Sequence, residues 1–225
     1  LFPGSFVLSF AYSEALLIAL AAACLLFLYR RQWLLAGIFA ALATATRPNG
    51  VALVAACGLA ALIAIWNDRE WRSLIAPLLA PLGFIAFQWY LRVHTDENWA
   101  WFRVQTEAWA EGTSFGATAL QDTFGFLTHP LNSPTDVLTT TSLFAMFALL
   151  FTAWKKRLPW PMVAYVAVVL ALMLIPETVT ARPRFVYTAF PLFLSAGAWW
   201  PEDDETSWAH DGWTLLIALC AAGLV

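Results

Sequence analysis

The stretch LLAGIFAALATATRPNGVALVAACGLAALIAIW, residues 34–66, decides the fold class because Arg47 is its only charged residue. Next to this arginine, Pro48 and Gly50 break a helix, so we expect two short helices that meet at the break. Backbone outside a helix is tolerated at membrane depth only where protein or enclosed water satisfies its polar groups. The break therefore predicts a protein-lined polar site between two apolar segments.

The whole chain shares this apolar character. Of its 225 residues, 61% are hydrophobic and only 12% are charged, whereas soluble domains have about 25% charged residues. Further apolar segments occupy residues 11–29, 74–91, 142–154, 160–175 and 185–200. The pattern predicts an all-α fold, a polytopic transmembrane helical bundle that forms a single domain over residues 1–225.

The charge balance and the cysteines exclude several other classes. A net charge of -3 offers no basic surface for nucleic acid. Cys24, Cys57 and Cys220 are far apart within apolar runs, so we expect packing residues, not disulfides or zinc ligands. A phosphate-binding glycine loop, a zinc-protease helix and a serine nucleophile elbow are all missing from the sequence. We therefore expect no metal and no cofactor.

The two ends resemble the interior of a longer protein. No methionine or signal peptide precedes Leu1. The last apolar run, residues 214–225, is shorter than the roughly 20 residues that cross a bilayer. We expect a fragment that lacks N-terminal spans and the first outer loop.

Basic residues predict the orientation. If Arg30 and Arg31 are cytoplasmic, alternating spans put most lysines and arginines on that side, as the positive-inside rule requires. They are Arg30, Arg31, Arg69, Arg72, Lys155, Lys156 and Arg157. Glu14, the loop 93–139 and the loop 177–184 then face outward. We expect a multi-pass cell-membrane protein with its working site on the extracytoplasmic side.

The outer loop, residues 93–139, contains an amphipathic pattern at 97–111. Trp99, Phe102, Thr106 and Trp109 recur on one face, and Arg103, Glu107 and Glu111 recur on another. This spacing predicts a helix with an Arg103–Glu107 pair that lies at the membrane surface.

Three polar clusters are candidates for chemistry. In the first, residues 9–14, the Glu14 carboxylate can bind sugar hydroxyls or hold an arginine. The alternative is an ordinary helix start, with Ser13 or Ser9 as the cap and Glu14 favoured by the helix dipole.

The second cluster is residues 46–50, where Arg47 needs an anionic partner because charge within a membrane is costly. A lipid phosphate suits its guanidinium group. The alternative is an internal ion pair, with Glu14 as a partner, that only holds the bundle together.

The third cluster lies between Glu177 and Phe185, where Arg182 and Arg184 flank Pro183. Two guanidinium groups held by a proline can clamp a phosphate or pyrophosphate. The alternative is that each arginine simply extends to the interface from a helix end. His94, Asp96 and Glu97 are weaker candidates, because no second histidine lies at metal spacing.

The clusters carry a family resemblance. Tyr12-Ser13-Glu14-Ala15 followed by Arg47-Pro48-Asn49-Gly50 resembles the PIG-V family of mannosyltransferases, in the GT-C superfamily. Residues 102–109 and 182–192 are similar to bacterial, actinobacterial-like members. Pro48 stands where eukaryotic members, which act in glycosylphosphatidylinositol-anchor synthesis, have serine.

The resemblance implies a GT-C membrane enzyme that transfers mannose from polyprenyl-phosphate-mannose to a glycolipid or lipid-linked acceptor. Membrane lipids and these two substrates would be its partners. The resemblance implies an aspartate base upstream of Leu1 and leaves Glu14 as a secondary catalytic candidate. Arg47, Arg182 and Arg184 would bind the donor phosphate, and the substrate would contact Tyr12, Ser13, Glu14, Asn49 and Glu177.

Two other functions remain open. A GT-C enzyme could use another sugar or a protein acceptor. A secondary transporter is a candidate from a different class, because a broken helix at 47–50 is typical of transporter midplane sites.

Overall fold

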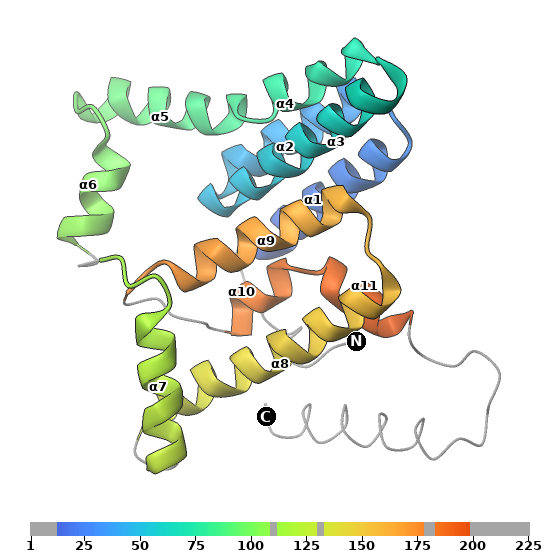
Figure 1. The fold of residues 1–225 in the computed structure, drawn as a ribbon. Helices are drawn as coiled ribbons and strands as arrows, with labels where there is room; N and C mark the ends of the chain where they lie inside the picture. The colour runs from blue at the N-terminus through green and yellow to red at the C-terminus, as the bar shows by residue number, and fades with distance from the viewer. Residues whose placement is uncertain (1–12, 109–111, 130–132, 178–182, 199–225) are drawn as a thin grey trace.

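The structure, a computed structural model, describes residues 13–108, 112–129, 133–177 and 183–198 (Figure 1). Its helices are α1 (Glu14–Tyr29), α2 (Trp33–Thr46), η2 (Pro48–Val51), α3 (Ala52–Asp68), η3 (Trp71–Leu74), α4 (Ile75–Leu79), α5 (Leu82–Thr95), α6 (Ala100–Glu107), α7 (Ala117–Thr128), α8 (Pro134–Lys156), α9 (Trp160–Leu174), α10 (Pro183–Thr188) and α11 (Pro191–Gly197). Within these ranges there is no β-strand, only an isolated bridge between Thr113 and Pro176. The predicted all-α fold is confirmed.

Small side chains form the contact between α1, α2 and α3. The fully buried positions are Ala21 and Cys24 on α1, Ala36, Ala40 and Ala43 on α2, and Ala56 and Cys57 on α3. Small residues let helix backbones approach closely, which increases van der Waals contact. Cys24 and Cys57 are free, with their sulfur atoms 3.8 Å apart, as expected of packing residues. Cys220 lies outside the described residues.

The break at residues 47–50 turns the chain back on itself. Arg47 is extended, with φ −152° and ψ 149°, and Pro48 starts η2. A Cβ on Gly50 would lie 2.5 Å from the carbonyl oxygen of Ala43, so this turn requires glycine. At the far ends, Arg31 Nη1 lies 2.5 Å from Asp68 Oδ2. The expected pair of short helices is therefore confirmed, and the two form an antiparallel hairpin.

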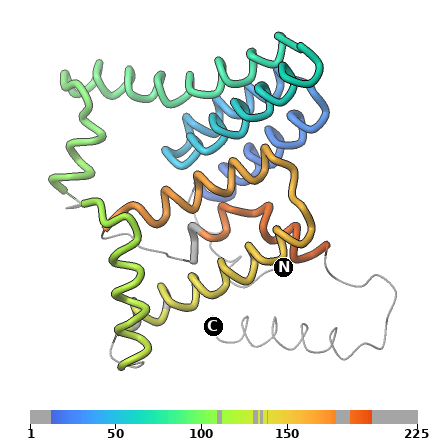
Figure 2. The backbone as a smooth tube through the Cα atoms, in the orientation of Figure 1, coloured from blue at the N-terminus to red at the C-terminus, as the bar shows by residue number. Residues whose placement is uncertain are grey.

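The hairpin defines two ends of the helix bundle (Figure 2). Trp66 near the end of α3 and Trp160 at the start of α9 line one hollow, so these helices run in opposite directions. We call the end with Arg30, Arg31, Arg69, Lys155, Lys156 and Arg157 the basic end. The opposite end holds Ser13, Glu14, the turn 47–51 and residues 174–177, and we call it the break end.

Helices α4 and α5 pack on α2 along one narrow contact. Ala76, Ala80 and Gly83 face α2, and the Thr44 hydroxyl donates a hydrogen bond to the Ala80 carbonyl at 2.8 Å. A Cβ on Gly83 would overlap the carbonyl oxygen of Ala41. This contact therefore depends on the missing side chain.

Among the described residues, two helical stretches are long and apolar enough to cross a membrane, by length and composition. They are Pro48–Asp68, with 21 residues, and Trp71–Thr95, with 25. In the second, only 11% of the apolar window is buried inside the protein. Helices α1, α2 and α9 are apolar but shorter.

The segment predicted at 142–154 is longer than expected. Helix α8 begins at Pro134, where the Ser133 hydroxyl accepts a hydrogen bond from the Asp136 amide at 3.4 Å. Serine at the N-cap followed by proline is a typical helix start. The residues that follow Pro134 are polar, so a prediction based on apolar runs placed the start of the helix too late. The outer loop therefore ends at Ser133 instead of residue 139, and it contains α7, which the sequence analysis did not predict.

The segment predicted as one helix at 185–200 is also different. The described part forms two short helices, α10 and α11, that meet at Ala189 and Phe190. Proline at position 191 has no amide hydrogen to continue the helix of α10. The prediction of a continuous span was therefore wrong for residues 185–198.

Replacing Gly83 with alanine should lower stability markedly, because its new methyl group would overlap the Ala41 backbone. Gly58→Ala is the matched control, since nothing lies within 4 Å of a Cβ there. Thermal unfolding in detergent should show a loss of roughly 2 kcal/mol for Gly83→Ala and no loss for Gly58→Ala. Equal stabilities would contradict the close α2–α5 contact.

Candidate functional site

The break end joins two of the predicted clusters. Glu14 begins α1 and Arg47 follows α2, and Arg47 Nη1 lies 2.7 Å from Glu14 Oε1. The same nitrogen donates a hydrogen bond to the Ser13 hydroxyl at 3.4 Å. The Glu14 side chain is 4% exposed and that of Arg47 is 22% exposed. The ion pair between Arg47 and Glu14, one of the alternatives left open by the sequence, is thus formed.

The Glu14 carboxylate has unused capacity to accept hydrogen bonds. Within the described part of the chain, neither oxygen receives a well-directed hydrogen bond, although the guanidinium nitrogen is close to Oε1. Burying a carboxylate without hydrogen bonds is costly even when a cation balances its charge. Oε2 is therefore a buried acceptor that has no hydrogen-bond partner among the described residues.

Ser13 forms a hydrogen bond with Arg47 instead of capping α1. It occupies the N-cap position of α1, but its hydroxyl makes no cap hydrogen bond and accepts one from Arg47 instead. Glu14 still lies in the first turn, where the helix dipole favours a negative charge. Asn49 is half-buried in η2, two residues after Arg47. Tyr12 and Ser9 lie outside the described residues.

The third cluster is only partly described. Arg184 is the second residue of α10, and α10 contacts α1, α8 and α9. The helix that carries Arg184 therefore packs against the helix that begins with Glu14. The side chain of Arg184 and all of Arg182 lie outside the described part, so the predicted clamp stays a prediction.

Glu177 lies in a contact that the sequence analysis missed. Its amide donates to the Gly112 carbonyl at 3.0 Å, and the Ser114 amide donates to the Ile175 carbonyl at 2.8 Å. A Cβ on Gly112 would overlap the exposed Glu177 carboxylate. These bonds tie the outer loop to the end of α9. No local sequence signal announces them, because backbone groups of distant segments make them.

Arg103 differs from Arg47 because its two carboxylate partners and solvent already accept its hydrogen bonds. On α6, its Nε donates to Glu97 Oε2 at 2.9 Å and its Nη1 to Glu107 Oε2 at 3.0 Å. The hydrogen bonds that Arg103 donates to Glu97, and then to Glu107, raise its pKa. The predicted Arg103–Glu107 pair is confirmed, on a helix shorter than the predicted 97–111.

The exposed ends of α5 and α6 hold no metal site. His94 lies near the Tyr90 carbonyl, with Nδ1 at 2.9 Å from the oxygen, and it is exposed. The described residues contain no group of three histidine, cysteine or acidic side chains that could bind a metal ion.

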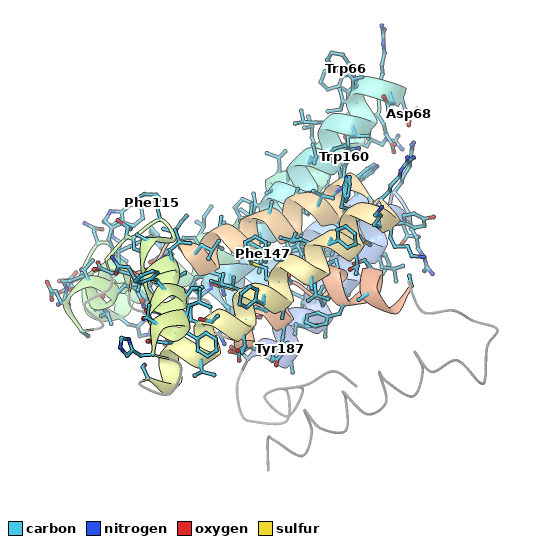
Figure 3. All side chains as sticks on the ribbon, turned by 60° about the horizontal axis from the view of Figure 1, so that its bottom comes forward. Trp66, Asp68, Phe115, Phe147, Trp160 and Tyr187 are labelled. Atoms are coloured by element: carbon cyan, nitrogen blue, oxygen red, sulfur yellow. The ribbon has the colours of Figure 1, made fainter. Side chains whose placement is uncertain are left out.

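A separate hollow lies at the basic end. Its volume is about 370 Å³, and it is lined by Leu62, Ile63, Trp66, Asn67 and Trp160. Trp66 and Trp160 project from that end (Figure 3). Its lining contains no charged residue and none of the candidate residues, so it is not part of the Glu14–Arg47 site.

No protein-family model, curated protein or solved structure matches the chain.

Substituting one member of the ion pair should destabilise the protein more than substituting both. Arg47→Met leaves a buried carboxylate without its cation, which should lower the free energy of unfolding by roughly 3 kcal/mol. The double variant Glu14→Gln with Arg47→Met should recover most of this loss. Thermal unfolding of Glu14→Gln, Arg47→Met and the double variant in detergent measures the coupling.

Arg103→Met is the matched control, because that arginine pairs with two exposed carboxylates at the surface. Its unfolding temperature should stay unchanged. Additive losses in the double variant would show that Glu14 and Arg47 do not interact.

Proposed function

We propose that this protein is a multi-pass membrane glycosyltransferase of the GT-C type. It transfers mannose from polyprenyl-phosphate-mannose to a glycolipid or lipid-linked acceptor on the extracytoplasmic side. The observation that carries the proposal is the Glu14–Arg47 pair, a buried carboxylate with free acceptor capacity next to a partly exposed guanidinium group. Such a pair suits a substrate that has both hydroxyls and a phosphate.

The surface of α4 and α5 supports a membrane location. Leu78, Ile85, Trp89 and Val93 are all more than half exposed, at 69%, 55%, 65% and 62%. Soluble proteins rarely expose a continuous apolar surface of this extent, because water contact with apolar area is unfavourable. A bilayer removes that cost, and the low burial of this helix argues against the core helix of a soluble protein.

The distribution of charge supports an orientation. The basic end collects Arg30, Arg31, Arg69 and the run 155–157, which suits the cytoplasmic side. The break end would then face the extracytoplasmic leaflet. A polyprenyl-phosphate donor presents its phosphate at the headgroup level of that leaflet, within reach of Arg47.

The proposed reaction uses the cations at the break end. The oxygen of the acceptor hydroxyl forms a bond to the anomeric carbon and its proton passes to a carboxylate base. The bond from that carbon to the phosphate oxygen breaks at the same time, and its electron pair leaves with the phosphate. Arg47, with Arg182 and Arg184, stabilises the negative charge that develops on the departing phosphate. Helix α10, which carries Arg184, packs against α1, so its approach to the same phosphate is compatible with the fold.

The polar neighbours would hold the sugars. Glu14 accepts a hydrogen bond from a substrate hydroxyl through the oxygen that Arg47 leaves free. Ser13, Asn49, Tyr12 and Glu177 provide further substrate contacts in this proposal. The lipid-linked donor supplies the activated sugar, and no cofactor is required. The resemblance of residues 12–15 and 47–50 to the PIG-V family favours mannose.

The alternative GT-C enzyme, with another sugar or a protein acceptor, would use the same site geometry. Competition assays between different sugar donors would identify it. The transporter reading is weaker. The broken helix of a transporter continues across the bilayer, whereas α2 and α3 return to the same end, where Arg31 meets Asp68. This hairpin geometry supports the enzyme proposal over the transporter alternative.

Arg47→Ala and Arg184→Ala should each lower mannose transfer by roughly 100-fold, because each removes a cation from the departing phosphate. Labelled mannose transferred from polyprenyl-phosphate-mannose by membranes that contain the full-length protein measures the rate. Arg103→Ala, the exposed control, should retain activity. Near-normal transfer by both Arg47→Ala and Arg184→Ala would rule out the proposed site.

The orientation is tested separately by cysteine accessibility in intact cells. Asn67→Cys lies at the basic end and His129→Cys follows α7, near the start of α8 at the break end. A membrane-impermeant maleimide added outside should label His129→Cys and leave Asn67→Cys unlabelled until the membrane is opened. The reverse pattern would contradict the orientation.

A further inference from the structure

Helix α7 presents an apolar stripe that no other described segment covers. Leu120, Phe124 and Leu127 are 71%, 68% and 65% exposed and lie at helical spacing on one side. Gln121 and Thr128 are exposed on the adjacent side. The exposed surface of this helix is therefore divided into an apolar part and a polar part, as in helices that lie at a membrane surface.

The opposite face of α7 fixes this orientation. Ala119 is buried, and the Thr123 hydroxyl donates to the Ala119 carbonyl at 2.7 Å. A Cβ on Gly125 would lie 2.8 Å from Asp136 Oδ2, so α7 approaches the first turn of α8 closely. Packing on α8 therefore holds the helix with its apolar stripe outward.

The contact with α8 sets the depth of α7. With 23 residues, α8 is about 34 Å long, slightly longer than the roughly 30 Å hydrocarbon core of a bilayer. Its first turns are polar, and its exposed apolar residues Phe144, Phe147 and Phe151 come later. Phe147 is labelled on α8 in Figure 3. Helix α7 packs beside the polar turns, and in Figure 1 it runs across the direction of α8 and α9.

We propose that α7 lies in the headgroup region of the extracytoplasmic leaflet, with Leu120, Phe124 and Leu127 inserted among the acyl chains. The proposal rests on the membrane location in the proposed function and assigns a lipid-binding surface beyond it. The three stripe residues carry no charge, so their binding depends on apolar area and not on anionic lipid. Helix α7 differs in this from α6, whose exposed surface carries Arg103 and Glu107.

The size of the stripe favours lipid over a second copy of the chain. Three side chains of this kind present about 400 Å² in total, whereas a stable protein interface needs about 800 Å² on each partner. Insertion of the stripe into a bilayer requires no minimum area, because the other apolar surfaces of the same protein already hold the protein in the membrane.

Spin labels test the proposal in full-length protein reconstituted in phosphatidylcholine nanodiscs. Single cysteines at Leu120, Phe124 and Leu127 are compared with Gln121→Cys on the polar side of the same helix. The native cysteines are replaced with alanine in all variants, and only monodisperse samples are used. Ile85→Cys on α5 serves as the control for membrane location.

We expect the ratio of oxygen to nickel-chelate accessibility at the three stripe positions to exceed that at Gln121 by roughly threefold or more. Stripe positions as open to the nickel chelate as Gln121, or closed to both reagents, would overturn the proposal. If Ile85 is in lipid when this happens, the membrane location still stands. An aqueous Ile85 would instead reject the membrane location, and the α7 proposal with it.

Discussion

The buried ion pair between Glu14 and Arg47 is the constraint on which the break end depends. It joins the start of α1 to the end of α2, and it places an arginine where the chain leaves one helix and turns into the next. Because neither charge is well solvated, each requires the other. Neither oxygen of the carboxylate accepts a well-directed hydrogen bond in the described structure. Burying a carboxylate in this way is costly, and the proposed substrate hydroxyl would reduce that cost.

Close packing of small residues makes this pair possible. Alanines and the two cysteines at buried positions let α1, α2 and α3 approach one another. Gly50 of η2 lies against Ala43 of α2, and Gly83 of α5 lies against Ala41 of α2. Helix α5, in contrast, contacts the bundle along only one edge and leaves most of its apolar surface outside. Small side chains therefore make the tight contacts between helices, whereas α5 leaves large apolar side chains such as Ile85 and Trp89 exposed.

Some of the segments that follow α5 meet near the break end. The outer loop is tied to the end of α9 by the bonds of Gly112 and Ser114, and α7 packs against the start of α8. Arg184 lies on α10, and α10 contacts α1. In the proposed enzyme, these elements surround a site at the headgroup level, where both a lipid-linked donor and a glycolipid acceptor are accessible without leaving the bilayer.

Much of this was determined by the sequence itself. Few charges and long apolar runs determined an all-helical chain, and Pro48 and Gly50 determined the break, because proline and glycine act through their own backbone. The four-residue spacing of Arg103 and Glu107 determined their ion pair for the same local reason. Helix α7, the early start of α8 and the separation of α10 from α11 were missed. These features depend on polar residues or on short segments, which a hydropathy pattern does not detect.

Only the tertiary structure decided which groups meet across the chain. The sequence allowed Arg47 to bind either a ligand or Glu14, and the packing of α1 against α2 brought the two within 2.7 Å. The sequence contained no sign that Gly112 would lie against Glu177 or that Glu70 would accept a hydrogen bond from the Trp33 indole. Local propensities act over a few residues, whereas these contacts depend on how whole helices are positioned relative to one another.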